Sequence, residues 1–252
     1  MTAVFDFSDA VLRRLAQDDV ARALAEDVGP GDLTAGLIAP ERQAHARILA
    51  RESAVICGAA WAEAALQQVV PEARVRWQVR DGQRCAADQV VLELTGPARG
   101  LLTAERTVLN FLQLLSAVAT KTAEYVAAVD SMPGNRARIV DTRKTLPGLR
   151  MAQKYAVHCG GGVNRRIGLY DAVLIKENHI AAAGGVTAVL QRAAAVAPTA
   201  KFVEIEVETL GQLREALDAG VTIVLLDNMP LATIREAVKM ADGRCSLEIS
   251  GG

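Results

Sequence analysis

Basic side chains are concentrated in one segment of this 252-residue sequence, between Arg138 and Lys176, although the whole chain has a formal net charge of −1. The segment holds two acidic residues, Asp141 and Asp171, and a run of three glycines just before NRR. Arginine presents a planar fork that matches carboxylate or phosphate oxygens, and glycine lets the backbone approach a ligand. The basic residues are Arg138, Arg143, Lys144, Arg150, Lys154, Arg165, Arg166 and Lys176. The segment therefore predicts a pocket for a small molecule with several negative charges.

Carboxylates form a second group of candidate residues. In EIEVE, Glu204, Glu206 and Glu208 alternate with apolar residues, so the two-residue period of a strand places them on one face. Asp227 follows the apolar run TIVLL. Glu206 and Asp227 could hold sugar hydroxyls or Mg²⁺, which binds carboxylates together with phosphate oxygens. A solvated edge strand would give the same alternation, and Asp227 could serve only as a helix cap.

Lys176 ends the apolar run AVLI, so its ammonium group is expected at the end of a strand. Three roles fit this position. The ammonium could contact phosphate or carboxylate, a desolvated lysine could form a Schiff base, or the side chain could only extend into solvent. The residues alone leave these three roles open.

The first elements that must position these residues mix helices and strands. Ser8 is expected to cap a helix that ends at Gly29–Gly31, and MPGN is a turn signal after a long apolar helix. Strands are expected at 46–49, 75–79 and 90–94, and helices at 58–70 and 101–129. This pattern predicts an α+β sandwich domain over residues 1–116.

Strand and helix patterns alternate regularly in the rest of the chain. Strands are expected at 137–140, 172–175, 203–207, 223–226 and 246–249, with helices near 148–157, 186–196, 210–219 and 231–240. Repeated βα units predict a parallel sheet, and their number favours a barrel. Asp141, Lys176, Asp227 and Ser250 each follow a strand, where active sites of such barrels form. The predicted class is α/β, with an open parallel β/α barrel over residues 117–252.

Composition excludes several classes of protein. A pI near 6.3 and an aromatic content of 4% argue against a nucleic-acid binder. No apolar run approaches the roughly 20 residues that span a bilayer, and the start of the chain lacks the pattern of a signal peptide. The four cysteines are widely spaced, which argues against a metal-thiolate site or a disulfide framework. A cytoplasmic location without membrane or nucleic-acid partners is expected.

These motifs together resemble the quinolinate phosphoribosyltransferase family, the decarboxylating nicotinate-nucleotide pyrophosphorylases of de novo NAD synthesis. The resemblance covers nearly the whole chain. It implies the type II phosphoribosyltransferase fold and a head-to-tail homodimer with shared active sites, which can assemble further. Its motifs are ALAEDVGPGDLTAGLI, ERTVLNFLQLLSAVAT, DTRKTLPGLR, GGGVNRRIGLYDAVLIKENHI, EIEVETL, LLDNM and EISGG. The implied activity converts quinolinate and phosphoribosyl pyrophosphate into nicotinate mononucleotide, diphosphate and CO₂.

The resemblance also assigns roles to the basic residues. Arg143 and Arg166 would bind the two carboxylates of quinolinate, and Arg165 would add charge beside them. Lys144 and Lys176 would face the anions of both substrates. Both lysines are therefore expected among the catalytic residues.

Further roles fall on the carboxylates and the end of the chain. The resemblance implies that Glu206 and Asp227 are catalytic and hold ribose hydroxyls and the Mg²⁺-bound diphosphate, directly or through water. Arg106 would reach the active site of the partner subunit. Ser250, Gly251 and Gly252 would begin the loop that binds the 5′-phosphate.

Two features depart from the family pattern. Family members usually read Asn-His-Arg where this chain has Asn164, Arg165 and Arg166, and they continue beyond the position of Gly252 for a further strand and helix. Two alternatives to the implied activity therefore remain within the fold. One is an impaired or binding-only member, and the other is the related protein of molybdenum-transport operons. An aldolase that uses Lys176 is a third alternative.

Overall fold

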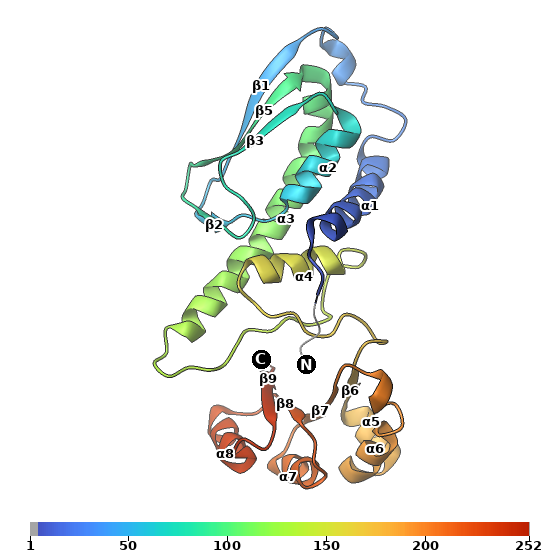
Figure 1. Cartoon of the computed structure of the whole chain (residues 1–252), viewed down its shortest axis with the longest axis vertical. Coiled ribbons are helices and arrows are strands. Elements are labelled where there is room, and N and C mark those ends of the chain that lie inside the picture. The colour runs from blue at the N-terminus through green and yellow to red at the C-terminus, as the bar shows by residue number, and fades with distance from the viewer. Residues whose placement is uncertain (1–4, 252) are drawn as a thin grey trace. The chain divides into compact units, whose positions relative to one another are not determined.

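The computed structural model describes residues 5–251, which divide into two compact units (Figure 1). The first unit extends to Arg165, and the second begins at Arg166. None of the helices in the described residues is both long enough and apolar enough to cross a membrane.

An antiparallel sheet covers one side of the first unit, with its central strand β5 (Val90–Pro97) between β1 (Gln43–Leu49) and β3 (Arg74–Trp77). Burial alternates residue by residue along β1, because successive side chains of a strand point to opposite faces. The inward face packs on the core together with the buried Leu92 and Leu94. A second, short antiparallel pair is formed by β2 (Ala54–Val55) and β4 (Arg84–Cys85).

Helices complete the first unit. The longest is α3 (Ala98–Asp130), against which α1 (Asp9–Asp27), α2 (Ala59–Val69) and α4 (Arg150–Cys159) pack (Figure 1). A 3₁₀ turn, η1, spans Ala35–Leu37. The fully buried Trp61 lies in the core and donates its indole N–H to Asp19 at 2.9 Å, which satisfies both buried polar groups.

The second unit is a four-stranded parallel sheet in the order β6-β7-β8-β9. Its strands are β6 (Val173–Ile175), β7 (Val203–Val207), β8 (Ile223–Asp227) and β9 (Ser246–Ser250). Its helices are α5 (Glu177–Ala183), α6 (Val186–Ala193), η2 (Ala197–Thr199), α7 (Leu210–Asp218) and α8 (Leu231–Ala241). Ile205, Val207, Val224 and Leu226 are fully buried with the apolar faces of the helices. The helices thus cover one face of the sheet.

The predicted α/β class, with a small antiparallel sheet followed by parallel β/α units, is confirmed, although the described parallel sheet is open. One strand prediction was wrong: residues 137–140 contribute only a parallel bridge between Val140 and Val163. The bridge consists of two backbone hydrogen bonds, from Val163 N–H to the carbonyl of Ile139 at 2.9 Å and from Asp141 N–H to the carbonyl of Val163 at 3.0 Å. The short helix α5 was missed because Ile180 is its only buried residue, which leaves no apolar periodicity to detect.

One helix start differs from prediction, and one predicted N-cap residue makes no capping hydrogen bond. A helix was expected from about residue 148, but α4 begins at Arg150, because Gly148 adopts a φ of +79°, outside the helical region. Ser8 does occupy the N-cap position of α1, yet its side chain makes no capping hydrogen bond. The backbone N–H of Ser8 instead donates to Asp6.

Candidate active site

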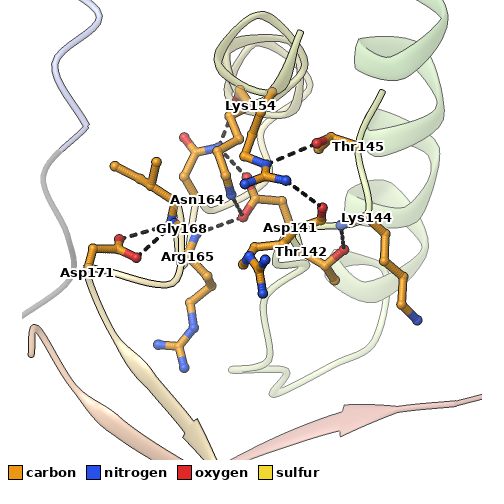
Figure 2. Close-up of polar contacts among 12 residues, drawn as sticks. Asp141, Thr142, Lys144, Thr145, Lys154, Asn164, Arg165, Gly168 and Asp171 are labelled. Atoms are coloured by element: carbon orange, nitrogen blue, oxygen red, sulfur yellow. Dashed lines mark hydrogen bonds and ion pairs between the residues drawn. The ribbon is translucent and has the colours of Figure 1, made fainter. Parts of the chain in front are cut away.

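Asp141 lies at the centre of a buried polar network in the first unit (Figure 2). Its Oδ1 accepts from the Lys154 ammonium at 2.6 Å and from the backbone N–H of Arg165 at 2.8 Å. Its Oδ2 accepts from the side-chain amide of Asn164 at 2.8 Å. Only 1% of the Lys154 side chain and 6% of the Asp141 side chain are exposed. The pair is therefore internal, and its charges are compensated by each other and by hydrogen bonds.

Helix α4 also braces the loop that follows Asp141. The Arg150 guanidinium donates to Thr145 Oγ1 at 3.1 Å and to the carbonyl of Arg143 at 3.3 Å. Gln153, on the same helix, accepts from the backbone N–H of Leu146 at 2.7 Å. The backbone of the DTRKT loop is thus fixed at several points by one helix.

This bracing divides the basic residues into two kinds. Arg150 and Lys154 use their charge inside the first unit, so they do not form the surface of an anion pocket. Lys144 is exposed, and the Nε of Arg143 is buried without a hydrogen-bond partner among residues 5–251. In Figure 2 the side chains of Lys144 and Arg165 extend away from Asp141. Charge counting along the sequence could not separate these two kinds.

The glycine run that follows α4 serves packing. A Cβ atom added at Gly160 would clash with the carbonyl of Ala119 and lie 2.7 Å from Thr122 Cβ, both on α3. A Cβ at Gly162 would lie 2.8 Å from Thr122 Cγ2. Gly161, between them, has a φ of +85°. The run allows close approach of α4 to α3, a contact that the sequence did not distinguish from a ligand-binding loop.

Replacing Gly160 by alanine is expected to lower the free energy of unfolding of the first unit by about 1–3 kcal/mol, because the new methyl group meets helix backbone that cannot easily move. Chemical denaturation followed by tryptophan fluorescence measures this loss. Gly36→Ala is the matched control, since nothing lies within 4 Å of an added Cβ there. Equal stability of the two variants would contradict the packing role.

In the second unit, Asp171 shapes the loop that begins with Arg166. Its carboxylate accepts from the backbone N–H groups of Ile167 and Gly168, each at 2.9 Å, and lies 3.5 Å from the ammonium of Lys201. Burial opposes ionisation, but these contacts outweigh it and hold the pKa of Asp171 below its ordinary value. The Nε of Arg166 donates to the carbonyl of Gly168 at 2.6 Å, so part of this guanidinium is used to fix its own loop.

The predicted carboxylates share the face of the second-unit sheet opposite to the helices. Glu206 pairs in register with Leu225, which pairs with Glu248, and Asp227 pairs with Ser250. These residues all follow the two-residue period, so their side chains point to one face. Glu248 was missed, although SLEIS carries the same alternation as EIEVE. β7 lies inside the sheet, which rules out the solvated edge strand as an explanation for its glutamates.

The positions of Lys176 and Asp227 exclude one of the roles considered for each. The Lys176 ammonium lies 3.5 Å from Glu206, and 49% of its side chain is exposed, so within the second unit it lacks the desolvation that a Schiff-base lysine needs. Asp227 is the last residue of β8, and Pro230 occupies the N-cap position of α8, so Asp227 does not cap this helix. Both charged groups remain available at the carboxyl ends of strands.

The other predicted residues fall in separate places. Arg106 is exposed on α3 beside a cavity of about 280 Å³ lined in part by Thr34 and Leu102. Gly251 follows β9 with a φ of +118°, and an added Cβ would clash with Asn228, so only glycine fits. Gly252 lies outside the described residues.

Two cysteines that are distant in sequence meet in the first unit. The ligand atoms of Cys57, Asp81 and Cys159 lie within 4.8 Å of one another. Burial raises the pKa of the Cys57 thiol, and the hydrogen bond with Cys57 lowers the pKa of Cys159. Asp81 accepts from the backbone N–H of Ala59 at 3.1 Å and from the Tyr155 hydroxyl at 3.0 Å. Spacing gave no signal for this cluster, because its members come from three separate elements.

Comparison with known proteins identifies the family. The model described as the quinolinate phosphoribosyl transferase C-terminal domain matches residues 118–252, and that of the N-terminal domain matches residues 32–116. The chain is 45% identical to the nicotinate-nucleotide pyrophosphorylase [carboxylating] of Mycobacterium leprae, over 94% of this chain and 84% of that protein. It is 41% identical to the probable nicotinate-nucleotide pyrophosphorylase [carboxylating] of Bacillus subtilis, over 90% of this chain and 78% of that protein.

A solved structure agrees with the sequence comparisons. The nicotinate-nucleotide pyrophosphorylase from Francisella tularensis superposes with a TM-score of 0.90 at 41% identity, covering 95% of this chain and 84% of that one. Both domain models of one family, two relatives above 40% identity and this structural match point the same way. The family predicted from the motifs is thus confirmed, and the chain belongs to the quinolinate phosphoribosyltransferase family.

Proposed function

We propose that this protein transfers the phosphoribosyl group of 5-phosphoribosyl 1-pyrophosphate to quinolinate and decarboxylates the product, giving nicotinate mononucleotide, diphosphate and CO₂. The observation that carries the proposal is that cationic and carboxylate side chains lie on different structural elements. Arginines and a lysine extend from loops held by α4 and by Asp171, and carboxylates occupy one face of the β6–β9 sheet. The names of the relatives point to the same reaction.

Quinolinate carries two carboxylates, so its recognition requires paired cationic forks. Arg143 suits this task because its Nε is buried and has no hydrogen-bond partner among residues 5–251. Arg165 and Arg166 supply further positive charge, and Lys144 and Lys176 neutralise the anions of both substrates. Because the loops are already braced, little conformational entropy is lost when the anions bind.

Transfer of the ribosyl group develops positive charge on the sugar while diphosphate leaves. Carboxylates stabilise such a centre electrostatically, and they accept hydrogen bonds from ribose hydroxyls. Glu206 and Asp227 are suited to both roles, since each lies on the open face of the sheet near the end of a strand. Ser250 and Gly251 offer a hydroxyl and a close backbone approach for the 5′-phosphate.

Mg²⁺ is the cofactor that these residues fit. It prefers one or two carboxylates combined with substrate phosphate oxygens, and Glu206 and Asp227 offer such donors, directly or through water. When bound, the ion supplies charge neutralisation for the departing diphosphate. Lys176 limits the net negative charge at Glu206, to which it lies 3.5 Å away.

A homodimer in the cytoplasm is part of the proposal. Arg106 is exposed on α3, and it is suited to reach the substrates bound by a second copy of the chain. Exposed apolar side chains near it, Leu33, Leu37 and Leu102, offer surface that a partner subunit would bury. Light scattering measures the oligomeric state, and a mass of at least two chains is expected.

The direct test incubates the protein with quinolinate, phosphoribosyl pyrophosphate and Mg²⁺ and detects nicotinate mononucleotide by mass spectrometry. Product is expected from the unmodified chain, and Asp227→Asn is expected to lower kcat by about 100-fold or more, because one charged group that acts on the transition state is lost. Asp218→Asn, which changes an exposed carboxylate on α7, is the matched control. Measurable quinolinate binding without product would contradict the proposed activity and favour a binding-only protein.

A further inference from the structure

We propose that Asp141 is a positioning residue for the anion-binding arms of the first unit. We call the segment with Arg143 and Lys144 the 143–144 arm, and the segment with Asn164 and Arg165 the 164–165 arm. Asp141 would set the distance between these two arms through the hydrogen bonds that it accepts. The proposal rests on the proposed function for the identity of the anion, quinolinate. Asp141 itself would not contact substrate, since only 6% of its side chain is exposed.

Asp141 joins two segments that are distant along the chain. Its own backbone starts the loop that carries Arg143, and the N–H of Asp141 donates to the carbonyl of Val163 at 3.0 Å. Its carboxylate holds the N–H of Arg165 and the amide of Asn164, both at 2.8 Å. One residue therefore fixes both arms, through its backbone and through its side chain (Figure 2).

The Asp141 carboxylate is surrounded by groups of one chemical kind. All three groups that face the carboxylate are donors: the Lys154 ammonium, the Asn164 amide and the Arg165 backbone N–H. A carboxylate satisfies them because it only accepts hydrogen bonds. Asparagine at this position would turn an NH₂ group toward one of these donors, so the arrangement specifically requires an ionised aspartate.

The positive charge that compensates Asp141 comes from Lys154 on α4, the helix that also braces the loop after Asp141. Asn164 also donates to the carbonyl of Lys154 at 2.8 Å, so the second arm is attached to α4 at two points. Arg150, one turn earlier on α4, holds the carbonyl of Arg143. Both arms are thus hydrogen-bonded to α4. Asp141 also links the two arms directly to each other.

The test separates position from stability by using Asp141→Asn combined with Lys154→Met, which removes both buried charges together. Hydrogen exchange of the Arg165 N–H is expected to become about tenfold faster or more in this variant, because its acceptor is weakened, while amides inside α4 stay protected. The KM for quinolinate is expected to rise by about tenfold or more, as befits loss of one properly placed charged contact. The KM for phosphoribosyl pyrophosphate is expected to rise by a clearly smaller factor, because Lys144 alone among the residues of the two arms is proposed to face this substrate.

A role in stability alone would lower the melting temperature and the active fraction without this difference between the two KM values. Unchanged Arg165 exchange together with an unchanged quinolinate KM in the folded variant would overturn the proposal. Should the double variant fail to fold, Asn164→Ala decides, since it keeps the Asp141–Lys154 pair and removes the hydrogen bonds of the Asn164 amide to Oδ2 of Asp141 and to the carbonyl of Lys154. The same shifts, of smaller size, are then expected, and their absence overturns the proposal.

Failure of the proposed function would be visible separately. In that case the unmodified protein forms no nicotinate mononucleotide, whereas its quinolinate affinity, measured by calorimetry, still reports on the arms. Loss of this affinity together with faster Arg165 exchange in the variants supports positioning even without turnover. Affinity and exchange that both stay unchanged contradict it.

Discussion

Arg143→Met is expected to lower kcat/KM for quinolinate by about 100-fold while leaving the fold intact. A charge-assisted hydrogen bond to a carboxylate contributes roughly 1.5–3 kcal/mol, and about 2.7 kcal/mol corresponds to a factor of 100. The Nε of Arg143 has no partner among residues 5–251, so its removal leaves no protein acceptor unsatisfied. Steady-state kinetics at saturating phosphoribosyl pyrophosphate measure the effect.

Two further arginines are compared with Arg143, one as a neutral control and one as a residue that braces the loop. Arg214→Met removes an exposed guanidinium from α7 and is expected to leave kcat/KM unchanged. Arg150→Met removes the brace of the loop, so it is expected to lower stability as well as quinolinate affinity. A loss for Arg143→Met no larger than that for Arg214→Met would remove Arg143 from the proposed site.

Lys154→Met is expected to lower the free energy of unfolding of the first unit by about 3–5 kcal/mol, because it leaves the buried carboxylate of Asp141 without its counter-charge. Both tryptophans of the chain, Trp61 and Trp77, lie in the first unit, so their fluorescence during urea denaturation reports on this unit. The expected loss is a large part of the stability of an ordinary domain.

Removal of Asp141 and Lys154 together should cost less than Lys154→Met alone, because no isolated charge then remains buried. The exposed pair of Asp218 with Arg244 is the reference, and Asp218→Asn is expected to change stability by less than about 1 kcal/mol. A similarly small loss of stability for Lys154→Met would contradict this prediction, because it would show that the negative charge of Asp141 is compensated by other groups.

Periodicity explains which parts of the site were predictable. Asp227 and Ser250 were placed correctly at strand ends, and Glu206 on one face of its strand, because a strand repeats every two residues and parallel strands end at one edge of the sheet. The class of fold followed from the same alternation of βα units. These features depend on neighbours in sequence, which a sequence shows directly.

The Asp141 network could not be predicted in the same way. Lys154 and Arg165 were both counted as charges of an anion pocket, but Lys154 is internal and Arg165 is held by its backbone N–H. Their contacts with Asp141 join residues that are far apart in the chain, and no repeat marks them. Likewise, residues 137–140 have the composition of a strand, yet only Val140 finds a bridge partner in the described chain.

Asp141 fixes the backbone at position 165 without requiring a particular side chain there. The carboxylate binds the backbone N–H of Arg165, a group that every residue except proline possesses. Histidine, the usual residue of the family there, and arginine can therefore be exchanged without loss of that anchor. A change of side chain at this position can therefore alter the chemistry that the 164–165 arm offers to a substrate, while the hydrogen bond from the backbone to Asp141 is kept.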